Sequence, residues 1–70
     1  IGIDVFQIKN DLEIRLVDEL GQIIFQDIYS GFSGDKRIKL VTDKLGAAVY
    51  WIEILRDGEK TVRSVIILNE

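Results

Sequence analysis

The sequence predicts an all-β sandwich of about six antiparallel strands, and three observations carry this prediction. Apolar residues alternate with polar ones along most of the chain, while no segment keeps the 3.6-residue period of a helix. Turn-forming residues recur about every eight to twelve residues. The 70 residues include 12 Ile, 7 Leu and 6 Val, a density of branched aliphatic side chains that excludes intrinsic disorder.

The first expected strand contains a change of phase. The expected strands cover residues 3–9, 12–17, 23–29, 37–41, 49–55 and 61–68. In the first of them Ile3 and Val5 fall on one face, whereas Phe6 and Ile8 fall on the other. Because a β-bulge inserts one extra residue into a strand, it would reconcile the two phases. We therefore expect a bulge in this strand.

The second and third strands form an expected hairpin. On the second strand Leu12, Ile14 and Leu16 alternate with polar or charged residues, so they share the face that points to the core. The turn Asp18-Glu19-Leu20-Gly21 follows. Glycine adopts a positive φ without steric cost, so Gly21 is expected to supply this conformation.

The middle of the chain is expected to be less regular. Residues 30–35 have the composition of a loop. The fourth strand then places Ile38 and Leu40 inward. Residues 42–48 are too few to form a stable helix alone, so we expect an irregular crossover there.

The fifth strand carries the strongest strand signal in the chain. Tyr50, Ile52 and Ile54 share one face, which we assign to the core. Trp51 falls on the opposite face and is expected to be half exposed or to cover the sheet.

A second hairpin is expected at the end of the chain. The dipeptide Asp57-Gly58 is typical of a tight turn between two strands. The last strand ends in the run Val65-Ile66-Ile67-Leu68, which predicts burial on both faces. The same apolar ending, without a proline to guard it, raises the hypothesis that this strand pairs with a partner by strand addition.

Catalysis and cofactor binding are not expected, because the residues that these functions use most often are missing. The chain contains no His and no Cys, which removes the commonest general base, a thiol nucleophile, a disulfide framework and a zinc site of the usual type. The acidic pairs near turns are candidate calcium ligands, namely Asp18 with Glu19, Asp57 with Glu59, and Asp35 with Asp43. Their spacing matches no calcium loop, and aspartate is common in turns because its side chain bonds the backbone. We therefore expect no enzyme, no metal and no cofactor.

Composition also restricts the partners. The formal net charge of −3 and the isoelectric point near 4.8 argue against nucleic acid, whose binding needs a basic patch. No run approaches the roughly 20 apolar residues of a membrane-spanning helix. The sequence starts at Ile1 and lacks Met, so we expect residues 1–70 to be one domain that is a processed product or a piece of a longer protein.

Three segments together resemble the C-terminal sorting domain of proteins that Bacteroidetes export through the type IX secretion system. The segment 12–24 resembles the family's first hairpin, with its Asp, two residues, Gly and apolar pair. The segment 45–54 resembles its element of Leu followed by Val-Tyr and an alternating strand. The segment 57–67 resembles its closing hairpin and its basic, then aliphatic, last strand.

The resemblance implies an immunoglobulin-like β-sandwich of six to seven strands that acts as a sorting signal and has no active site. It also implies that residues 1–70 are the C-terminal part of a longer protein. It implies recognition by the translocon, a protein partner, and export of the cargo through the periplasm and outer membrane to the cell surface or the medium. The residues that correspond to the family's motifs are Asp18, Gly21, Tyr50, Gly58, Val65, Ile66 and Ile67. Each of them could serve either the fold or docking.

The alternative is a non-catalytic immunoglobulin-like accessory or interaction module of a secreted or surface protein from the same bacteria. Three departures from the family motivate it: Ala48 stands where the family has Gly, the chain ends without Lys, and no proline-rich segment precedes the first strand. The position of the domain within the parent protein would discriminate the two, because a sorting domain must come last. The sequence leaves the cargo and the oligomeric state open.

Overall fold

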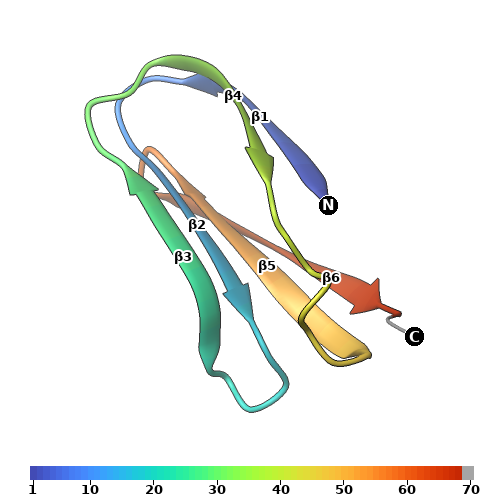
Figure 1. The fold of residues 1–70 in the computed structure, drawn as a ribbon. Coiled ribbons are helices and arrows are strands. Elements are labelled where there is room, and N and C mark those ends of the chain that lie inside the picture. The colour runs from blue at the N-terminus through green and yellow to red at the C-terminus, as the bar shows by residue number, and fades with distance from the viewer. Residues whose placement is uncertain (69–70) are drawn as a thin grey trace.

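A computed structural model describes residues 1–68 as two antiparallel β-sheets, with no helix in this part of the chain. The strands are β1 (Gly2–Ile8), β2 (Leu12–Val17), β3 (Ile23–Tyr29), β4 (Gly34–Lys39), β5 (Ala48–Arg56) and β6 (Glu59–Ile67). Four of them form a sheet in the order β3-β2-β5-β6, and β1 pairs with β4 in the second sheet (Figure 1). The predicted all-β class and the six strands are confirmed. Asn69 and Glu70, which the expected domain includes, lie outside the described residues.

The strand order corresponds to that of an immunoglobulin-type sandwich. In such a sandwich one sheet contains the C, F and G strands, with an added C′ strand in variable-type domains, and the other contains B next to E. Here β3-β2-β5-β6 occupies the places of C′-C-F-G, and β1-β4 occupies those of B and E. The pairs β1 with β4 and β2 with β5 are not consecutive in sequence. The chain therefore crosses between the sheets three times, after β1, after β3 and after β4.

The core lies between the two sheets. Leu12, Ile14 and Leu16 on β2 are its most enclosed side chains, as the alternation predicted. The other buried apolar residues are Val5, Ile8, Ile38, Leu40, Tyr50, Ile52 and Ile67. Ile54 is half buried against this cluster, on the face predicted for it. The inward faces of β2 and β5 therefore follow the alternation of apolar residues seen in the sequence.

The bulge expected in β1 is present, but one side chain differs from the expectation. The register against β4 shifts between Val5 and Ile8, and Gln7 in this interval has a φ of 56°. The shift brings Ile8 into the core together with Val5. Phe6 was expected to share the phase of Ile8, but its side chain is exposed because the extra residue separates the two. The carbonyl oxygen of Phe6 accepts a hydrogen bond of 2.8 Å from Nη1 of Arg56.

The expected burial of both faces at the end of β6 is wrong. Ile67 is buried and Val65 is half buried, but Ile66 is 67% exposed and Leu68 is 82% exposed. The physical reason is that the β1-β4 sheet covers only one face of the four-stranded sheet. The aliphatic run therefore follows the ordinary alternation of a half-buried strand.

Three connections join the sheets. The irregular crossover expected over 42–48 spans residues 40–47, because β4 ends at Lys39 and not at Val41 as expected, and Leu40 exchanges backbone hydrogen bonds with Ile1. In the connection from β3 to β4, Phe32 packs near Tyr29, and Nζ of Lys36 lies 4.9 Å from the centre of the Tyr29 ring. This cation–π contact holds the start of β4 against the end of β3.

Candidate recognition site

Six of the seven motif residues lie at the same end of the four-stranded sheet. Val17, the last residue of β2, pairs with Trp51, so the turn that follows it lies level with the start of β5. The end of β6 is at the same level, because Tyr50 pairs with Val65. We call this region, made of turn 18–21, the start of β5 and the end of β6, the 18–21 end (Figure 1). Gly58 is at the opposite end, in the β5–β6 turn.

Turn 18–21 is held together by Asp18. Its Oδ1 accepts hydrogen bonds from the backbone N–H groups of Leu20 at 2.9 Å and Gln22 at 2.8 Å. Its carbonyl oxygen accepts a third from the N–H of Gly21 at 3.1 Å. Gly21 has a φ of 80°, which confirms the expected positive value. Asp18 and Gly21 therefore act together to build the turn.

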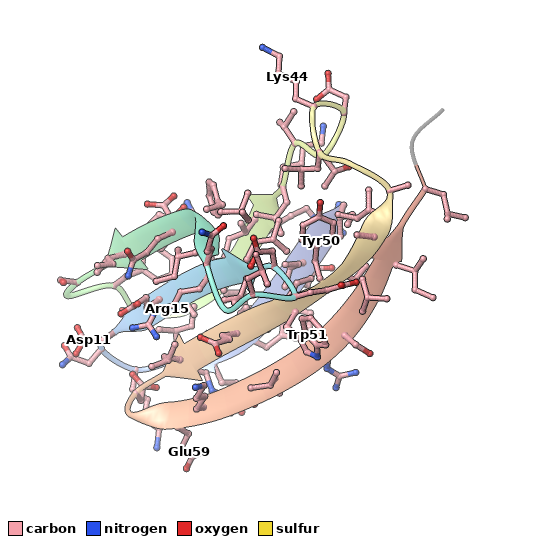
Figure 2. The ribbon with its side chains drawn as sticks, turned by 90° about the horizontal axis from the view of Figure 1, so that it is seen from below. Asp11, Arg15, Lys44, Tyr50, Trp51 and Glu59 are labelled. Atoms are coloured by element: carbon pink, nitrogen blue, oxygen red, sulfur yellow. The ribbon has the colours of Figure 1, made fainter. Side chains whose placement is uncertain are left out.

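Tyr50 joins the core to the crossover. Its ring is buried, and its hydroxyl donates a hydrogen bond of 2.9 Å to the carbonyl oxygen of Gly46, four residues earlier. Immunoglobulin-type sandwiches have a tyrosine in the corresponding place, near the start of strand F, with the same kind of bond. Trp51 points to the other side of β5 and is half exposed, as expected (Figure 2).

Large apolar side chains are exposed at the 18–21 end, beside the exposed polar residues Glu19 and Gln22 of the turn. Leu20 in the turn is 84% exposed, and Ile66 and Leu68 at the end of β6 are also largely exposed. The sequence singled out Ile66 for its place in an aliphatic run, but it gave no signal for Leu20 or Leu68 as surface residues. Of the six motif residues here, Ile66 is the one whose large apolar side chain is exposed to solvent.

Asp57 is a structural residue whose role the sequence did not reveal. Its Oδ1 accepts hydrogen bonds from the backbone N–H groups of Asn10 at 2.8 Å and Asp11 at 3.0 Å, and its Oδ2 from that of Lys9 at 2.9 Å. These bonds, chiefly the one from Lys9, hold the pKa of the Asp57 carboxyl below its usual value. The β5–β6 turn is thereby fastened to the loop between β1 and β2. Asp57 and Gly58 both have positive φ, 51° and 86°, as the predicted tight turn requires.

Replacing Asp57 with asparagine is expected to destabilise the domain at neutral pH and to have little effect in acid. The unfolded carboxyl protonates near pH 3.8, whereas the folded one keeps its charge to a lower pH. Its stabilising contribution is therefore complete above pH 3.8 and is lost as the pH falls through the lowered folded pKa. Asparagine still tolerates the positive φ of the turn, so the change mainly removes the charge and one acceptor. Urea unfolding of both proteins from roughly pH 6 to pH 2 should show their midpoints converging in acid. A constant difference in midpoint would contradict this assignment.

The described part of the chain shows neither a cluster of metal ligands nor a membrane-spanning helix. Within residues 1–68 no group of three or more His, Cys, Asp or Glu side chains is placed to hold a metal ion. The structure also has no helix there that is long and apolar enough to cross a membrane. What the 18–21 end can do is present a rigid turn and exposed aliphatic side chains to another protein.

The comparisons with known proteins give one match. The family model described as the secretion system C-terminal sorting domain matches residues 1–68, which include all six strands. No curated protein and no solved structure matches the chain.

Proposed function

Because the chain belongs to the family of secretion system C-terminal sorting domains, we propose that the secretion machinery recognises its folded sandwich, and chiefly the 18–21 end. Domains of this family are the sorting signals of the type IX system of Bacteroidetes. They mark proteins for export to the cell surface or the medium, and they are not catalytic. What we propose for this chain is the surface that the secretion machinery contacts.

The main support for the proposal is that the family match covers the whole of the described fold. The match runs from residue 1 to residue 68 and so takes in every strand of both sheets. A short linear signal would need a few exposed residues, not a complete sandwich. We therefore propose that residues 1–70 act as one domain, and that they form the C-terminal part of a longer exported protein.

The motif residues divide into two roles under this proposal. Asp18, Gly21, Tyr50 and Gly58 build turns or the core, so they would serve recognition by fixing the shape. Val65 and Ile67 point toward the core, whereas the Ile66 side chain points to solvent. Together with Leu20 and Leu68, Ile66 would form the contact surface for the machinery, since apolar side chains gathered on a surface favour protein contacts.

Export of a fused reporter tests this proposal. Residues 1–70 would be fused to the C-terminus of a periplasmic reporter in a bacterium with a working type IX system. We expect the reporter at the surface or in the medium, and in the periplasm of a strain that lacks the translocon. A reporter that stays periplasmic while an established sorting domain exports it would overturn the assignment of the signal to this chain.

Lysine substitutions test the proposed contact surface. Ile66→Lys and Leu20→Lys should each lower export severalfold without lowering the melting temperature, because both side chains are exposed. Val62→Lys is the matched control, since Val62 is an exposed apolar residue of the same strand, β6, away from the 18–21 end. Equal export by all three variants would show that the machinery reads another surface.

A further inference from the structure

The outer face of the four-stranded sheet is unusually apolar for a surface. The β1-β4 sheet packs on the other face, and none of the described residues forms a layer over this one. By register its apolar residues are Val17, Ile23, Ile28, Val49, Trp51, Leu55, Val62 and Ile66. Apolar side chains grouped in this way mark a site of association with another protein.

The charged residues of this face are already paired with one another. Arg15 forms ion pairs with Glu13 and, at 3.4 Å, with Glu53. Lys60 lies 3.3 Å from the second carboxylate oxygen of Glu53. Two acids and two bases leave the face neutral, so the net charge of −3 lies on the rest of the chain. Two copies of this chain would repel each other least through this face.

We propose that two copies of the domain associate through the outer faces of their four-stranded sheets, as a symmetric dimer. The twofold axis would run parallel to the strands and midway between β2 and β5. In the order β3-β2-β5-β6, this axis places β2 of one copy over β5 of the other, and β3 over β6. Because the same surface of both copies is in contact, that surface must be complementary to itself in shape and charge.

The register of the sheet provides this complementarity. Val17 and Trp51 are paired neighbours on β2 and β5, so the axis brings Val17 of each copy opposite Trp51 of the other. Arg15 and Glu53 are also paired, so each Arg15 comes opposite the other copy's Glu53. One apolar contact and one opposite-charge contact therefore form at the centre of the interface, and each occurs twice by symmetry.

The size of the face allows only a small interface. Four strands about 4.8 Å apart, with about seven residues each rising about 3.3 Å, make a face of roughly 20 by 23 Å. Two such faces bury about 1,000 Å², which is the lower limit for a specific interface. We therefore expect a weak dimer with a dissociation constant of about 10–100 µM.

Trp51 reports directly on this interface, because it is the single tryptophan of the chain. Its emission should shift to shorter wavelength as the concentration of the isolated chain rises from about 1 µM to about 1 mM, and the sedimentation coefficient should rise over the same range. An emission that does not change with concentration would overturn the proposal.

Charge substitutions locate the interface. Val17→Lys and Ile23→Lys keep Trp51 and should each weaken dimerisation at least tenfold, by placing a cation among apolar side chains. Val41→Lys is the matched control, because Val41 is 81% exposed in the crossover and off this face, and it should dimerise like the parent. Circular dichroism of every variant checks that it is folded. A dimer that persists in both folded face variants would overturn the proposal, since it would form through another surface, such as a strand edge.

Discussion

Replacing Ile14 with alanine is expected to unfold most of the domain in water at room temperature. Its side chain is fully enclosed, with 0% exposure, on the strand that lies between β3 and β5. Truncating a buried isoleucine to alanine costs about 2–5 kcal/mol, because apolar contacts are lost and a cavity remains. A domain of this size without disulfides or metals has only about 3–5 kcal/mol of stability to lose.

Urea unfolding followed by Trp51 fluorescence measures this effect, with Ile28→Ala as the matched control. Ile28 is also a strand isoleucine, on β3, but it is 58% exposed and should change the free energy of unfolding by no more than about 0.5 kcal/mol. Equal midpoints for Ile14→Ala and the parent protein would show that the core does not lie between the two sheets.

The strands could be predicted because each is specified by its own alternation. Leu12, Ile14 and Leu16 identify the inward face of β2 without any knowledge of its neighbours. The tight turns are equally local, since Gly21 and Gly58 adopt conformations that favour glycine. Both properties depend on residues within a few positions, which a sequence displays directly.

The features that could not be predicted depend on contacts between distant segments. The aliphatic run 65–68 shows no alternation in its sequence, and its exposure is decided by which face of the four-stranded sheet the β1-β4 sheet covers. Asp57 was expected only to form a turn, but its carboxylate also binds amides 46 to 48 residues earlier in the chain. A sequence does not reveal which of its turns will meet.

The candidate site was predictable in its components but not in its arrangement. Asp18 and Tyr50 each bond within four residues of their own position, so the motif segments contain the whole of these interactions. Their gathering at one end of the sheet follows from the pairing of β5 with both β2 and β6. Leu20 and Leu68 join this surface through that pairing alone.

Tyr50 allows the contributions of the fold and of a direct contact to be separated. Tyr50→Ala is expected to cost about 3–5 kcal/mol, because a buried aromatic ring is lost. Tyr50→Phe keeps the ring and loses only the hydrogen bond to Gly46, a cost of about 0.5–1.5 kcal/mol. Thermal unfolding of both variants should therefore give a folded Phe variant and an Ala variant that is largely unfolded.

The export assay with the same two variants tests whether the machinery recognises the folded shape that Tyr50 maintains. Because Tyr50 is buried and its hydroxyl is bonded within the chain, a partner gains no contact from it while the domain is folded. Tyr50→Phe should accordingly export the reporter nearly as well as the parent, and Tyr50→Ala should lose export in proportion to its unfolded fraction. Strong loss of export by a folded Tyr50→Phe variant would instead mean that the hydroxyl itself is recognised, which requires the 18–21 end to open when it docks.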